Sequence, residues 1–350
     1  MTNKSIIKAK KVKNDEFYTF YKDIAKEMKY YKKELEGKVV YLPCDNPKWS
    51  NFYKYFKRNY KKLKLKGLIA TYYDISNLIT TKTIVRGGIE QEEVLNNNGD
   101  FFLNTEILNE CDIVITNPPF SLFRDFIKIL NDYDKQYIIL GNINAITYKI
   151  VYGLIFYDKL FLGKTKVNRF YTPTKEIKTI ACYWYTNIKI KKKIPFLKLT
   201  KKYNSEEYPK YDNYDAINVN KVKDIPYDYD GVMGVPISFL EKMNDKQFQL
   251  VGFRKGDDGK DVTYRHTYRQ TDRQTDRQTD RQTDRQADRY NHSPEYSSES
   301  CNTSLFKKKM DIPKIISSTH IMRVLSSGKE VLINNKEIFT RILIQKIPIK

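Results

Sequence analysis

The stretch Asp112-Ile113-Val114-Ile115-Thr116-Asn117-Pro118-Pro119-Phe120 is typical of a hydrophobic strand that runs directly into a proline-rich loop. Apolar residues at helical spacing follow this loop, namely Phe123, Phe126, Ile127 and Leu130. The sequence therefore predicts a strand, a stiff loop and a helix in succession. In open α/β sheets, ligands bind at the carboxyl ends of such strands, so we expect the loop to belong to a functional site.

Strand and helix patterns alternate on both sides of this stretch. Strands are predicted at 38–42, 67–71 and 136–141, and helices at 16–35 and 50–63, where Ser50 is a plausible N-cap. The alternation predicts an α/β fold with a doubly wound, mostly parallel sheet. Residues 75–98 are polar, and we expect them to form an irregular surface excursion.

The alternation stops near residue 186, and this change indicates a division into domains. We expect a basic flexible N-terminus at 1–14, a cofactor-binding and catalytic domain at 15–185, a smaller target-recognition region at 186–262, a low-complexity insert at 263–329, and C-terminal strands at 330–350 that complete the recognition region. In the last of these, residues 331–333 and 338–344 are predicted to pair as a hairpin.

A tetrapeptide repeat, Arg-Gln-Thr-Asp, fills residues 269–289. Its period is shorter than that of any solenoid and it buries no apolar surface, so disorder is expected. A tetranucleotide tract of CAGA units encodes Gln-Thr-Asp-Arg in every reading frame. We therefore interpret the repeat as a microsatellite within the gene.

The formal charge of +21 and the pI of about 9.5 favour a polyanionic partner, although an AT-rich genome would also raise the lysine content. The distribution of charge is more specific. Residues 1–66 hold 19 Lys and Arg against 7 Asp and Glu, and residues 189–202 carry no acid. The predicted phosphate contacts are Lys189, Lys191, Lys192 and Lys193.

Several classes of protein are disfavoured. No signal peptide is evident, and the most apolar window, 137–163, is interrupted by polar residues, which argues against a membrane span. The cysteines are widely separated, so neither a zinc site nor a disulfide framework is implied. We expect a cytoplasmic protein, associated with the nucleoid if bacterial, that is monomeric and needs no metal.

The residue types of the proline-rich loop fit one kind of chemistry. An exocyclic adenine amine is a weak nucleophile because its lone pair is delocalised into the ring. The Asn117 side-chain oxygen and the Pro118 carbonyl can accept both amino hydrogens and turn the lone pair toward an electrophilic methyl group. Pro118 and Pro119 stiffen the loop, and Phe120 offers a face on which the extruded base can stack.

Three weaker signals suggest where a cofactor binds. Gly99-Asp100-Phe101 places an acid beside an aromatic residue, which suits a cofactor adenine. The turn Leu42-Pro43-Cys44-Asp45 follows the first strand but lacks the GxGxxG fingerprint, and this absence disfavours a dehydrogenase. Asp74 lies just past the second strand, where it can reach ribose hydroxyls or remain an ordinary surface carboxylate.

These residues resemble those of the EcoRI-type family of adenine-specific DNA methyltransferases. The similar blocks are 15–19, 39–45 with 50–52, 99–101, 112–123, 141–147, 208–219, 231–236 and 339–344. The resemblance implies an S-adenosylmethionine-dependent methyltransferase fold and duplex DNA as substrate, with a cognate endonuclease as a possible companion. It assigns Asn117, Pro118, Pro119 and Phe120 to catalysis, and Tyr18, Thr19, Asp45, Asp100 and Phe101 to the cofactor. From their positions after the first and second strands, Pro43 and Asp74 are predicted as further cofactor contacts.

Two alternatives stay open at this point. Loops of this type also serve methylation of RNA adenine and of protein amides, although the basic clusters favour DNA. The microsatellite raises a different possibility, a decayed gene product that retains only DNA or cofactor binding.

Overall fold

A computed structural model describes residues 17–74, 79–95, 105–190, 193–212, 215–253, 332–333, 336–337 and 341–348. The described chain forms two compact units. The first contains the described residues through Leu197 together with Ile237–Asn244, and the second contains Lys198–Pro236 and the described residues from Asp245 onward. Each unit has a sheet of its own.

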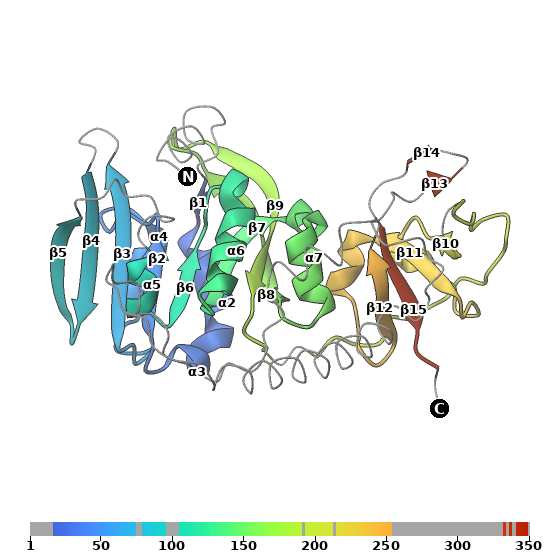
Figure 1. Cartoon of the computed structure of the whole chain (residues 1–350), viewed down its shortest axis with the longest axis horizontal. Helices are drawn as coiled ribbons and strands as arrows, with labels where there is room; N and C mark the ends of the chain where they lie inside the picture. Colours follow the sequence, from blue (N-terminus) through green and yellow to red (C-terminus); the bar gives the residue numbers. More distant parts are fainter. Residues whose placement is uncertain are drawn as a thin grey trace, which may run out of the picture. The chain divides into compact units, whose positions relative to one another are not determined.

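The first unit alternates strands and helices around one sheet, which Figure 1 shows with β5 at one edge. Its elements are β1 Tyr18–Thr19, α2 Tyr21–Met28, η1 Lys29–Tyr31, α3 Lys32–Leu35, β2 Val39–Pro43, α4 Asn51–Arg58, β3 Gly67–Asp74, β4 Ile79–Arg86, β5 Ile89–Leu95, α5 Glu106–Glu110, β6 Ile113–Thr116, η2 Phe120–Leu122, α6 Phe123–Asp132, β7 Gln136–Asn142, η3 Ile143–Thr147, α7 Lys149–Phe156, β8 Phe161–Tyr171, β9 Ile177–Thr186 and η5 Ile237–Glu241. The strands that the structure describes here form a nine-stranded sheet in the order β1-β8-β9-β7-β6-β2-β3-β4-β5.

This sheet is mixed, so the prediction of a mostly parallel sheet was wrong. The four strands β7, β6, β2 and β3 run parallel, whereas β9, β8 and β1 on one side and β4 and β5 on the other are antiparallel to their neighbours. The helix α4 connects β2 to β3 and α6 connects β6 to β7, and such crossovers produce parallel pairs. Hairpins connect β3 to β4, β4 to β5 and β8 to β9, and therefore produce antiparallel ones.

Two local predictions also need correction. The helix predicted at 16–35 begins only at Tyr21, because Tyr18 and Thr19 pair with Tyr171 and Phe170 of β8 as the strand β1. The segment 75–98 is not an irregular excursion, since it contains β4 and β5, which pair around a Gly87-Gly88 turn. Both glycines have positive φ, as a two-residue hairpin turn of this type requires. The predicted N-cap is confirmed, because the Ser50 hydroxyl accepts hydrogen bonds from the backbone nitrogens of Phe52 and Tyr53.

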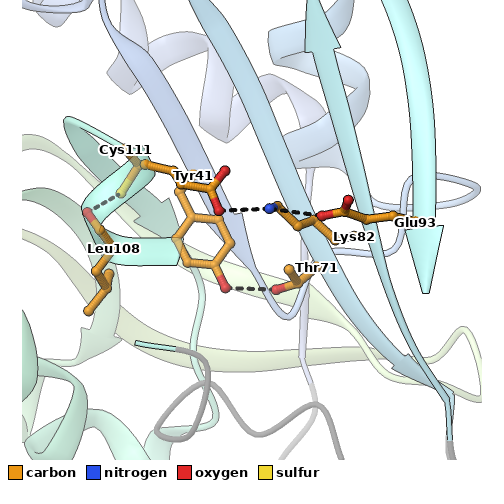
Figure 2. A network of polar contacts seen from close by, with 7 residues as sticks. Tyr41, Thr71, Lys82, Glu93, Leu108 and Cys111 are labelled. Carbon is orange, nitrogen blue, oxygen red and sulfur yellow. Dashed lines mark hydrogen bonds and ion pairs between the residues drawn. The ribbon is translucent and has the colours of Figure 1, made fainter. Parts of the chain in front are cut away.

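The core of the first unit lies between the parallel strands and their covering helices, and buries side chains such as Phe56, Leu68 and Trp184. A network of polar contacts lies at β4, around the buried Lys82 (Figure 2). The Lys82 side chain is 8% exposed, and its ammonium pairs with Glu93 of β5 at 2.9 Å and with Glu110 of α5 at 2.8 Å. Beside it, the Tyr41 and Thr71 hydroxyls hydrogen-bond at 2.8 Å. The bond between Tyr41 and Thr71 joins β2 to β3, and the two ion pairs of Lys82 join β4 to β5 and to α5.

The second unit has a four-stranded sheet whose order is β10-β11-β15-β12. Its elements are β10 Ala216–Asn218, η4 Val222–Asp224, β11 Val232–Pro236, β12 Phe248–Phe253, β13 Leu332–Ile333, β14 Lys336–Glu337 and β15 Arg341–Lys346. The strand β15 lies between β11 and β12 and is antiparallel to both. The predicted pairing of 331–333 with 338–344 was therefore wrong: β13 pairs with β14, and residues 341–346 are an inner strand of the larger sheet. The repeat at 269–289 and the segment 1–14 lie outside the described residues.

Among the described residues, no helix combines the length and apolar character needed to cross a bilayer.

Candidate active site

The ends of β2 and β6 meet at the point where the strand order of the sheet reverses. From β2 the chain proceeds to β3 on one side and then to β6 on the other, so β2 and β6 flank a topological switch point. Ligands of open α/β sheets bind in the crevice outside such strand ends. A cavity of about 510 Å³ occupies this position. It is lined by Phe17, Tyr18, Thr19, Cys44, Asp45, Trp49, Ser50, Asn51, Phe52, Thr71, Tyr72, Tyr73, Asn117, Pro118, Pro119, Phe120, Tyr171, Thr172, Pro173 and Lys175.

Asn117 directly follows β6 and reaches the cavity with its orientation fixed. Its side-chain nitrogen donates to the backbone oxygen of Phe17 at 2.6 Å. A carbonyl oxygen can only accept, so the other amide atom of Asn117 is the oxygen, Oδ1. That oxygen is buried and has no hydrogen-bond partner within the described chain. Because a buried polar atom without a partner is unfavourable, Asn117 Oδ1 marks a place where a ligand donor can bind.

The aromatic ring of Phe120 packs against two other rings. Phe17 stacks on it with ring centroids 5.5 Å apart and an interplanar angle of 27°, and Phe170 approaches at 6.2 Å in an edge contact. The three rings come from distant segments of the chain: Phe17 precedes β1, Phe120 follows β6 and Phe170 lies in β8. The contacts hold the loop 117–120 against β8 and the residue before β1.

The strand β1 carries a second unpaired polar group into the cavity. The Thr19 hydroxyl oxygen is buried and has no hydrogen-bond partner in the part of the chain that the structure describes. Its backbone oxygen accepts a hydrogen bond of 2.8 Å from the side-chain nitrogen of Asn51, at the first turn of α4. Residues 17–19 are thus hydrogen-bonded to the loop 117–120 at one point and to α4 at another.

Asp45 lies in the turn between β2 and α4 and is 8% exposed. Its Oδ1 accepts from the Ser50 hydroxyl at 2.6 Å, and its Oδ2 lies 3.1 Å from the Thr116 hydroxyl oxygen. Burial raises the pKa of Asp45 to about 7, against the opposing effect of the hydrogen bonds with Ser50 and Thr116. The preceding residue, Cys44, adopts a left-handed φ of 66°, so this turn forms without the glycines usual in nucleotide-binding loops.

One wall of the cavity is aromatic and was not predicted. The Trp49 ring makes edge contacts with Tyr18 at 4.6 Å and Tyr72 at 6.1 Å. Another wall is the turn between β8 and β9, which contributes Thr172, Pro173 and Lys175. The residues of these two walls do not form a sequence motif, because they are distant in the chain and come together only through the order of the strands in the sheet.

The predicted site residues divide into four groups, the last of which is the pair of lysines described below. Tyr18, Thr19, Asp45 and the loop 117–120 line the cavity together. Pro43 does not line it, but its backbone oxygen accepts a hydrogen bond of 2.6 Å from the Thr116 hydroxyl. The side chains of Asp74, Asp100, Phe101, Lys191 and Lys192 lie outside the described residues.

Lys189 and Lys193 are both exposed. The Lys189 ammonium lies over the Phe161 ring at 5.7 Å. Their positions leave both side chains accessible to a partner.

Comparison with known proteins gives consistent results along most of the chain. Residues 5–346 match the sequence model of the family described as "Adenine-specific methyltransferase EcoRI". The type II methyltransferase M.EcoRI of Escherichia coli is 44% identical over 302 residues, which cover 75% of this chain and 93% of that protein. Two further relatives are M.MpnI of Mycoplasma pneumoniae, 38% identical, and M.MgeORF184P of Mycoplasma genitalium, 37% identical; each match covers 70% of this chain and 84% of the relative.

Proposed function

Because the chain belongs to the EcoRI family of adenine-specific methyltransferases, we propose that it methylates the N6 amine of adenine in duplex DNA and that Asn117 binds this amine. The family implies S-adenosylmethionine as the methyl donor. The observation that carries the assignment of Asn117 is its buried, unpaired Oδ1 at the cavity. A hydrogen-bond acceptor held in this way suits an amino group of the substrate.

The proposed role of Asn117 follows from its two hydrogen-bonding atoms. Its nitrogen is committed to the Phe17 oxygen, so the side chain cannot rotate without breaking that bond. The fixed Oδ1 accepts one amino hydrogen of adenine, and the Pro118 carbonyl accepts the other. With both hydrogens held, the nitrogen lone pair is directed out of the plane of the base. Such preorganised contacts accelerate a reaction because they need no rearrangement in the transition state.

The cavity residues fit the methyl donor. A cavity of about 510 Å³ is within the range of sites for ligands of this size. We propose that Thr19 and Tyr18 contact the methionine part and that Trp49 and Tyr72 offer rings for the adenine. The unpaired Thr19 hydroxyl supports a polar ligand at this wall. When bound, the donor supplies a methyl group on a positively charged sulfur, which is the electrophile of the reaction.

The target base has to leave the DNA helix before its amine can reach Asn117. One face of Phe120 is occupied by Phe17, so we propose that the extruded adenine uses the remaining face of Phe120.

The proposed phosphate contacts are Lys189, Lys191, Lys192 and Lys193. The monomeric state and the second unit as target-recognition region are further parts of the proposal, the latter supported by its separate sheet.

The proposal is tested by incubating the purified protein with methyl-labelled S-adenosylmethionine and mixed-sequence duplex DNA. We expect label in N6-methyladenine at one recognition sequence, which modification mapping of host DNA identifies. A duplex in which that adenine is already N6-methylated is the matched control. Label in RNA or protein but not in DNA would contradict the proposal, and binding of cofactor and DNA without transfer would indicate a decayed enzyme.

A further inference from the structure

The turn between β8 and β9 brings a positive charge to the cavity. Lys175 lies in this turn, lines the cavity and is exposed. It is the only lysine among the described residues that line the cavity, and none of those residues is an arginine. Within the described part of the chain, Lys175 forms no ion pair. Its ammonium group is therefore available to an anionic group of a ligand.

Hydrogen bonds fix the backbone of this turn. The backbone nitrogen of Thr172 donates to the Glu176 oxygen at 2.9 Å, and that of Lys175 donates to the Thr172 oxygen at 2.9 Å. The Thr172 hydroxyl lies 2.8 Å from the Thr174 hydroxyl and accepts from the Glu176 nitrogen at 3.1 Å. Because the chain is held on both sides of Lys175, its side chain starts from a defined position at the cavity wall.

The sheet places this turn beside the strand that is proposed to contact the methionine part of the donor. Tyr18 of β1 pairs with Tyr171 of β8, and Thr172 is the next residue of the chain. Tyr18 and Thr19 line the cavity together with Thr172 and Lys175. The methionine part of S-adenosylmethionine carries a carboxylate, which is the only negatively charged group of the donor. A carboxylate at this wall would lie on the same side of the cavity as Lys175.

The second charged side chain of the cavity does not suit a carboxylate. Asp45 and Lys175 are the only Asp, Glu, Lys or Arg residues among the described residues of the lining. Asp45 is itself an acid, and its two oxygens accept hydrogen bonds from the hydroxyls of Ser50 and Thr116. A second carboxylate next to it would be repelled. Lys175 is therefore the charged partner that the cavity offers to the carboxylate of the donor.

We propose that Lys175 binds the carboxylate of the methyl donor and holds the methionine part of the donor against β1. The inference rests on the proposed cofactor site. An ammonium group and a carboxylate form a charge-assisted hydrogen bond, which is stronger than a bond between neutral groups. Lys175 is exposed, so the ion pair keeps some contact with solvent, and dissolved salt should weaken it.

Equilibrium binding of two donors tests the proposal in the absence of DNA. S-adenosyl-L-methionine has the carboxylate, whereas decarboxylated S-adenosylmethionine lacks it and keeps the positive sulfur and the amino group. Replacing Lys175 by Asn should raise the Kd of the first donor about three- to tenfold and leave the Kd of the second unchanged. Asparagine accepts the left-handed φ of 63° at this position, so the variant should retain the turn.

Two further variants serve as controls. Lys175→Arg keeps the positive charge and should keep most of the affinity for S-adenosyl-L-methionine. Lys178→Gln removes an exposed charge from β9 in the same hairpin, outside the lining of the cavity, and should change neither Kd. Raising the salt concentration should reduce the difference in Kd between the wild type and Lys175→Asn. Thermal unfolding of each variant checks that the fold is unchanged.

An equal rise in Kd for both donors in Lys175→Asn, or no rise for either donor, would overturn the proposal. If the Kd values stay unchanged while the salt dependence of DNA binding falls, Lys175 contacts a DNA phosphate instead. A protein that shows the expected difference between the donors but does not methylate DNA would leave the proposal standing and contradict the proposed function.

Discussion

The Asn117 side-chain nitrogen donates to the backbone oxygen of Phe17 at 2.6 Å, across 100 positions of sequence. This bond joins the end of β6 to the start of β1, and it decides which atom of Asn117 faces the cavity. Phe17 also stacks on Phe120, so a single residue orients both ends of the loop 117–120. The loop 117–120 is therefore fixed by a residue that precedes the sheet, in addition to its own prolines.

Replacing Asn117 by Ala should lower the rate of methyl transfer strongly and leave cofactor affinity nearly unchanged. Loss of one preorganised polar contact of this kind reduces turnover by about 10²–10³-fold. Single-turnover transfer and equilibrium binding of S-adenosylmethionine measure the two effects. The control is Asn131→Ala, which removes a bond of the same length to the Ile127 oxygen in α6, outside the cavity. Wild-type turnover in Asn117→Ala would exclude Asn117 as the amine acceptor.

Replacing Asn51 by Ala should instead weaken cofactor binding. Asn51 lines the cavity and holds the Thr19 backbone oxygen at 2.8 Å. A hydrogen bond of this kind contributes about 0.5–1.5 kcal/mol, which corresponds to roughly a two- to tenfold rise in Kd. Asn59→Ala is a matched control, because it removes a 2.8 Å bond to the Tyr55 oxygen at the other end of α4. An equal Kd in the two variants would show that the contact with Thr19 does not support the cofactor site.

The loop 117–120 between a strand and a helix could be located from the sequence because its signals are local. Four strand residues, two prolines and a helix follow one another between 113 and 132, and the structure keeps this order. The Ser50 cap was predictable for the same reason, since its partners are two and three residues away.

Other parts of the site depend on contacts between distant segments. Phe17 continues the helical spacing of the residues after it, so the pattern includes it in a helix. The structure instead places it against Phe120 and Phe170. The hairpin of β4 and β5 was missed because β5 is largely exposed, so polar residues obscure the alternation that a half-buried strand shows. The glycine pair at 87–88 was the available signal for its turn.

The exposed lysines at 189 and 193 give a prediction about DNA affinity. If both contact phosphates, the double variant Lys189→Gln and Lys193→Gln should lower the slope of log K against log salt by about 0.9 per contact. Cofactor affinity should not change. The control is Lys128→Gln with Lys159→Gln, which removes two exposed charges elsewhere in the first unit. An equal slope in the two double variants would mean that Lys189 and Lys193 act only through net charge.

The position of β15 predicts that the number of repeats in the gene controls activity. The repeat at 269–289 precedes β15 in sequence, and β15 is an inner strand between β11 and β12. Gain or loss of one CAGA unit leaves the repeat itself unchanged but alters the sequence of every residue after it. Residues such as Ile342 and Ile344, which are fully buried, would then be replaced. The frame-shifted protein should therefore lose the four-stranded sheet and with it DNA methylation.

Removal of whole tetrapeptides is the matched comparison, because it shortens the repeat and keeps the frame. Long surface insertions contribute little to stability, so these variants should keep a thermal midpoint and a transfer rate close to those of the full chain. A chain truncated after Asp288 lacks β15, as the frame-shifted protein does, but carries none of the altered residues that a frameshift would add. Both sets are measured by thermal unfolding and by modification of host DNA. Full methylation by the chain that ends at Asp288 would show that β15 is dispensable, and the on–off control by repeat number would then be excluded.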